Sequence, residues 1–124
     1  MKTYTLLKLI RNCHSIARMK AMQGDIKMAI DMFQYEAVAL IHCKGLEDAF
    51  DLDCNPSRDD EREANVVNLV SRQPMVVGDV LIDNKTGIFY CCDVRGWSVH
   101  DSFSYDMPQM SGRLPACKPI ANFI

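Results

Sequence analysis

Short segments with apolar residues at every second position predict the strands of this protein. They fall at about 3–10, 36–43, 66–70, 77–82 and 88–93, and they contain many Thr, Tyr, Val, Leu and Ile side chains, which favour a pleated, half-buried surface. In segment 36–43 both alternating sets of residues are mostly apolar, which is typical of a central strand. The pattern therefore indicates about five strands.

Two other regions have the three- and four-residue spacing of an amphipathic helix. The first covers about 12–33 and is divided by Gly24, and the second covers about 45–52. We predict an α+β fold with a mostly antiparallel sheet and with both helical regions packed on one face of it.

Turn residues separate these elements. Gly78 permits a bulge or a positive φ at a strand entrance, and Asp79 can accept hydrogen bonds from the turn's backbone donors, so we interpret this pair as a structural turn. Arg95-Gly96 forms a late corner, and 97–100 follows it. We expect an α+β domain over 1–100 and a tail over 101–124 that packs on the domain or on a partner.

Composition narrows the function classes. The net charge is −2 and the pI about 5.8, which gives no overall attraction to nucleic acid or to anionic lipid. No apolar run approaches the length of a membrane span and the start is no convincing signal peptide, so we expect a cytoplasmic protein without a membrane partner. In that compartment the six cysteines are reduced thiols.

The cysteines and histidines lack the spacings of a zinc site, such as Cys-x-x-Cys, so we expect no metal and no cofactor. The single nucleophile constellation worth testing joins His100-Asp101 with Cys91 or Cys92, and its geometry is open at this stage. We therefore favour a non-catalytic protein and assign no catalytic residue.

Several motifs resemble those of small bacterial, phage and plasmid proteins of uncharacterised function. They are Tyr35 to Ala39, Leu46 to Phe50, Val77 to Val80 and Gly96-Trp97, and the likeness covers about 28–100. Members of that group often carry an Arg and two serines before Val-Gly-Asp-Val. This chain departs from that pattern, because Pro74 and Val76 occupy the serine positions and Arg72 is displaced by one residue. The resemblance implies a domain type and an origin in a mobile element.

We expect the protein to bind a host protein complex, such as a defence system, and to modulate or inhibit it. The predicted contact residues combine an acidic loop with late aromatic side chains: Asp59, Asp60, Glu61, Trp97, Phe103 and Tyr105. One alternative is a small-ligand binder or minor enzyme with a pocket lined by His42, Cys91 or His100. Another is nucleic-acid binding through basic residues of the first helical region: Arg11, Arg18, Lys20 and Lys27.

Overall fold

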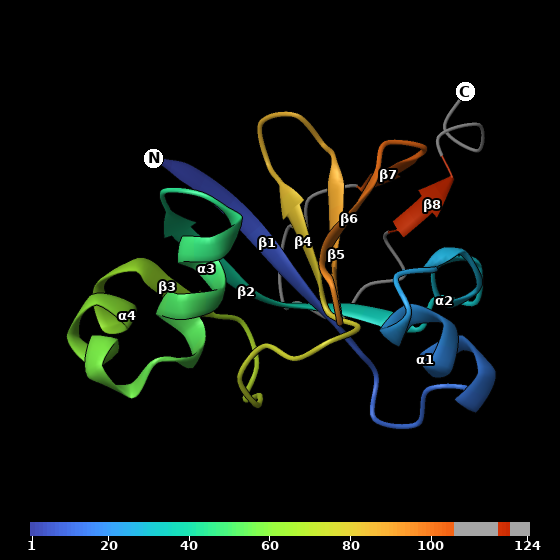
Figure 1. Ribbon diagram of the computed structural model, residues 1–124, viewed down its shortest axis with the longest axis horizontal. Coiled ribbons are helices and arrows are strands. Elements are labelled where there is room, and N and C mark those ends of the chain that lie inside the picture. The colour runs from blue at the N-terminus through green and yellow to red at the C-terminus, as the bar shows by residue number, and fades with distance from the viewer. Residues whose placement is uncertain (106–116, 120–124) are drawn as a thin grey trace.

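The structure is a computed structural model, and it describes residues 1–105 and 117–119. Strands β1 to β6 form one antiparallel sheet in the order β3-β2-β1-β4-β5-β6, and β7 pairs with β8 separately (Figure 1). The elements are β1 (Lys2–Leu9), α1 (Ser15–Met22), α2 (Lys27–Asp31), β2 (Tyr35–Cys43), α3 (Leu46–Cys54), a 3-10 turn (Pro56–Arg58), α4 (Asp59–Asn65), β3 (Val66–Asn68), β4 (Val80–Asp83), β5 (Phe89–Asp93), β6 (Gly96–His100), β7 (Phe103–Tyr105) and β8 (Cys117–Pro119).

The predicted α+β class is confirmed, but the main sheet has six strands rather than about five. The additional strand is β6, which continues from β5 through a turn of only two residues, Val94 and Arg95. Gly96 follows this turn with a φ of 131°, a left-handed conformation that glycine adopts without a steric penalty. A two-residue connection is typical of a β-hairpin, in which the chain reverses direction, so β6 pairs with β5.

The prediction that both helical regions pack on one face is wrong. Helices α1 and α2 cover one face of the sheet and α3 covers the other, so the sheet lies between them (Figure 1). The reason is visible in β1, where Leu6 and Leu7 are both buried although neighbouring residues of a strand point to opposite faces. Leu81 and Ile82 of β4 repeat this arrangement. Two apolar faces require two covering layers.

A β-bulge in β2 changes the face of the sheet on which its successive side chains lie. Leu6 pairs with Ala39 and Leu7 with Ala37, so Val38 is the extra residue. Ala37 therefore belongs to the core beneath α1 and α2, whereas Ala39 belongs to the core beneath α3. One strand thus contributes to both cores.

Helices α1 and α2 end in the same way but with different residues. After α1, Gly24 N–H donates to Ala21 O and Asp25 N–H donates to Lys20 O, and Gly24 has a φ of 89°. After α2, Phe33 N–H and Gln34 N–H repeat this pattern on Ile30 O and Ala29 O. This is the Schellman motif, whose left-handed position normally holds glycine. Phe33 occupies that position with a φ of 54°.

Phe33→Gly is expected to be more stable than Phe33→Ala by about 1 kcal/mol. Both variants lose the same half-exposed ring, and only alanine keeps a Cβ in the left-handed conformation. Urea denaturation of the two proteins measures the difference. The control compares Met19→Gly with Met19→Ala, within α1, where the alanine variant should be the more stable protein. Equal stability of the two Phe33 variants would show that this position is not strained.

Two segments of the predicted tail 101–124 are strands, β7 and β8, and β8 contacts α2. Residues 106–116 and 120–124 lie outside the described residues. In the part of the chain that the structure describes, no helix combines the length and apolar character needed to cross a bilayer.

Candidate functional site

An exposed apolar groove lies between α1 and the turn that joins β5 to β6. It has a volume of ≈ 450 Å³, and it is lined by Cys13, Ser15, Arg18, Met19, Met22, Gln23 and Val94. Met19, Met22 and Val94 form its apolar part, and they are 55%, 45% and 79% exposed. Because transfer of large apolar side chains out of water is favourable, a surface cluster of them is typical of places where proteins bind other molecules.

The sequence of α1 explains why these methionines face outward. Ala17 and Ala21 are four residues apart, lie on one side of the helix and are buried against the sheet. Met19 falls on the opposite side, where a surface helix normally carries polar residues. Methionine side chains are flexible and polarisable, so a surface that contains two of them can adapt to a partner's shape.

The charged residue that lines the groove is a cation. Arg18 lines it, and its guanidinium also donates to Ile10 O at 3.0 Å, which fixes the side chain against the connection between β1 and α1. Val94 stands between Asp93 and Arg95, so the β5–β6 turn itself carries one charge of each sign. Arg18 therefore favours an apolar partner segment that also carries a carboxylate.

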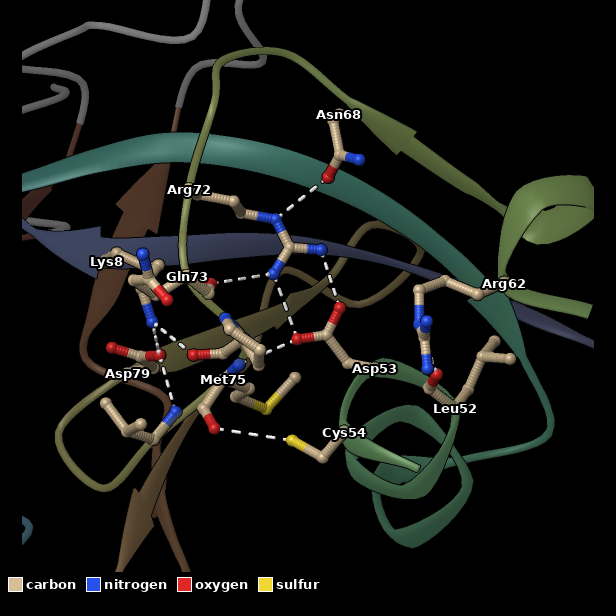
Figure 2. Close-up of polar contacts among 12 residues, drawn as sticks. Lys8, Leu52, Asp53, Cys54, Arg62, Asn68, Arg72, Gln73, Met75 and Asp79 are labelled. Atoms are coloured by element: carbon tan, nitrogen blue, oxygen red, sulfur yellow. Dashed lines mark hydrogen bonds and ion pairs between the residues drawn. The ribbon is translucent and has the colours of Figure 1, made fainter. Parts of the chain in front are cut away.

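A second feature is the loop between β3 and β4, which a buried ion pair holds in place (Figure 2). The carboxylate of Asp53 accepts hydrogen bonds from Arg72 at 2.6 and 2.9 Å and from Met75 N–H at 2.7 Å. The Arg72 guanidinium also donates to Asn68 Oδ1 and to Gln73 O. Because Asp53 belongs to α3, these contacts attach the loop to that helix.

A second carboxylate holds the end of the same loop. Asp79 accepts hydrogen bonds from Lys8 Nζ and from Val76 N–H (Figure 2). Burial raises the pKa of Asp79, and the ammonium of Lys8 opposes that shift. Gly78, beside it, has a φ of 97°, and Tyr35 donates its hydroxyl hydrogen to Gly78 O at 2.6 Å. The glycine and the aspartate thus form the turn that leads into β4.

A polar cleft of ≈ 520 Å³ borders this loop, and its residues are Asp53, Arg62, Asn68, Leu69, Val70, Ser71, Arg72 and Pro74. Its two arginines are already engaged by protein groups. Arg72 pairs with Asp53, and Arg62 pairs with Asp59 and donates to the carbonyl oxygens of Leu52 and Asn55. The cleft therefore offers little uncompensated positive charge to a ligand, and we interpret its polar groups as support for the loop.

The layer formed by α3 and α4 is strongly acidic. Eight carboxylates and three cations lie between Lys44 and Glu63. Arg58 binds three of those carboxylates, Asp48, Asp51 and Glu61, and the hydrogen bond that it donates to Glu61 lowers the pKa of that carboxyl group. The surplus of carboxylates leaves this side of the molecule negative.

The structure separates the contact residues that the sequence suggested. Asp59, Asp60 and Glu61 are exposed on α4, next to the β3 edge of the sheet, whereas Trp97 lies on β6 at the opposite edge. Trp97 is half-buried against the core beneath α3. Phe103 is buried, with its ring centroid 5.7 Å from that of Phe89. Tyr105 lies in β7, and its side chain is outside the described residues.

Of the cysteine and histidine candidates, Cys91 and His100 lie on the paired strands β5 and β6, whereas His42 lies on β2. Cys91 is buried, with its Sγ 3.4 Å from Ala21 O, while His42 is exposed and contacts Thr3 Oγ1. His100 Nε2 lies 2.9 Å from Gly24 O, so its ring serves the corner between α1 and α2. Among the described residues, no group of three or more His, Cys, Asp or Glu side chains could hold a metal ion.

Cys91 and Cys92 are expected to resist alkylation by iodoacetamide in the folded protein near neutral pH. Burial is the main cause that raises their pKa values to about 12 and about 11, and the reactive species is the thiolate. Mass spectrometry of peptides from native and urea-unfolded protein measures the labelling at each site. Rapid native labelling of either residue would contradict the buried positions described here.

Sequence reasoning missed the groove. The exposed methionines of α1 have the same three-residue spacing as core residues, and spacing alone does not show which side of a helix meets the sheet. The signal that could have found them is the pair Ala17 and Ala21, because small residues mark the side where a short helix lies close to a sheet.

No protein-family model matches this chain, and searches of the curated proteins and of the solved structures found no significant match.

Proposed function

We propose that this protein is a non-catalytic binding module that uses the groove between α1 and the β5–β6 turn to hold an apolar, carboxylate-bearing segment of a partner protein. The observation that carries the proposal is the exposure of Met19, Met22 and Val94 in one groove. We further propose that the partner is a host protein complex and that binding modulates or inhibits it, with a defence system as one example.

The chemistry of the groove favours a protein segment over a small polar ligand. Its exposed surface is mostly apolar, which rewards the burial of Leu, Ile or Phe side chains. Arg18 then selects partner segments in which a carboxylate accompanies the apolar residues, because a basic segment would bring like charges together.

The acidic surface over Asp59, Asp60 and Glu61 is proposed as a second contribution to the same complex. It lies on the other side of the molecule, so its role would be to meet a basic region of the partner or to speed the encounter through long-range attraction. Such an attraction weakens as salt is added.

The test uses this protein to capture binding partners from host lysate and identifies them by mass spectrometry. Separate variants test the groove and the acidic surface. Met19→Glu with Met22→Glu introduces carboxylates into the groove, and Met32→Glu places one directly after α2, outside the residues of the groove. We expect the double variant to lose a protein that the wild type and Met32→Glu retain. Equal capture by all three would refute binding in the groove.

The acidic surface has its own pair of variants. Asp60→Lys reverses an exposed charge on α4, and Asp101→Lys makes the same change after β6. If the acidic surface contributes, Asp60→Lys alone weakens capture, and the effect diminishes at high salt. Capture unchanged by Asp60→Lys would remove this surface from the proposal and leave the groove untouched.

A further inference from the structure

The outer edge of β6 carries backbone groups that point away from the sheet. Cys92 N–H donates to Asp79 O and Cys92 O accepts from Gly78 N–H, so the backbone groups of Cys92 point towards β4. Those of its neighbour Cys91 therefore point towards β6, where Cys91 faces Ser98. Because the direction alternates along a strand, the N–H and C=O groups of Trp97 and Val99 point outward.

This edge also lacks the features that usually prevent pairing between sheets. Edge strands are commonly short, charged or interrupted by proline. The opposite edge strand, β3, has only three residues, whereas β6 has five, Gly-Trp-Ser-Val-His, with neither proline nor an acidic or lysine residue. Among the described residues, β5 is the sole strand that pairs with β6. Val99 is 63% exposed.

We propose that β6 pairs with β6 of a second copy of this chain, in antiparallel orientation, about a two-fold axis at Ser98. This register places Trp97 opposite Val99 of the second copy, and Val99 opposite its Trp97. Both residues have outward backbone groups, so each pair forms the reciprocal hydrogen bonds of an antiparallel ladder. The six-stranded sheets of the two copies then form one continuous sheet.

The side chains agree with this register. Trp97 and Val99 are two residues apart and lie on the same face of the sheet, the face beneath α3. An aromatic residue opposite a β-branched one is a favourable cross-strand pair, and here it covers the exposed Val99. On the other face, Gly96 lies opposite His100 of the second copy, so the smallest residue of that face meets the largest residue of that face. No like charges meet at neutral pH.

The experiment is sedimentation equilibrium of the full chain over about two orders of magnitude of protein concentration. We expect a dimer at the higher concentrations. Val99→Lys, which brings a cation to each side of the axis, should weaken dimerisation by at least about tenfold. Val94→Lys makes the same change in the β5–β6 turn, off the edge, and should leave the dimer intact. Circular dichroism and urea denaturation confirm that both variants fold.

A covalent trap checks the register. Cysteines placed at Ser98 would face each other across the axis at a non-hydrogen-bonded pair, where the two strands are closest and a disulfide fits. Glutathione disulfide should cross-link Ser98→Cys into dimers through that residue, as mapped by mass spectrometry, but not Ser102→Cys. A chain that stays monomeric, or a dimer that Val99→Lys does not weaken, would overturn the proposal.

The outcome is separable from that of the proposed function. Val94 belongs to the groove and Val99 to the edge. Val94→Lys should reduce partner capture and spare the dimer, whereas Val99→Lys should reduce the dimer and spare binding in the groove. If Val94→Lys leaves partner capture unchanged, binding in the groove is rejected and the dimer is not. If Val99→Lys leaves the dimer unchanged, the dimer is rejected and binding in the groove is not.

Discussion

Replacing Arg72 with methionine is expected to lower the free energy of unfolding by roughly 3–5 kcal/mol. Both members of the Arg72–Asp53 pair are almost fully buried, with 8% and 1% of their side chains exposed. Methionine removes the partner of a carboxylate that has few routes to water, and it also frees the loop between β3 and β4. Urea denaturation measures the change. Arg95→Met, at an exposed position, is the control and should change stability by less than about 0.5 kcal/mol.

A second substitution separates the two causes. Asp53→Asn in the Arg72→Met background removes the unpaired negative charge while its amide oxygen can still accept from Met75 N–H. We expect this double variant to recover part of the lost stability. If it is no more stable than Arg72→Met, the buried charge is not what makes the single substitution costly.

Leu6→Ala and Leu7→Ala are each expected to cost about 2–5 kcal/mol, although the two leucines are adjacent in one strand. Leu6 is buried beneath α3 and Leu7 beneath α1 and α2. Because the two side chains lie on opposite faces, their effects should be nearly additive in the double variant. A sheet covered on one face would leave one of the two substitutions nearly silent, and that result would contradict the two-core arrangement.

Much of this fold could be predicted from the sequence, because alternation identifies strands well. The apolar character of both sets of residues in 36–43 even indicated a central strand, and β2 lies second from the edge, between β1 and β3. The positions of the two helical regions could not be predicted. Which face a helix covers depends on the connections between elements, and the bulge at Val38 depends on pairing with β1.

The candidate site was harder to predict from the sequence than the fold. The acidic composition of 59–63 is evident in the sequence, but its distance from Trp97 follows from strand order. Likewise, Asp53 and Arg72 are nineteen positions apart in the sequence, and their ion pair depends on the path of the loop between them. The groove joins α1 to Val94, residues far apart in the chain, so no local pattern could reveal it.

The most direct test of the account is the affinity of the captured partner for Met19→Glu/Met22→Glu relative to the wild type, with Met32→Glu as the control. If the groove holds the partner, the double variant binds at least about tenfold more weakly and the control binds normally, while all three proteins unfold at similar urea concentrations. Undiminished affinity in the double variant would show that the partner binds elsewhere.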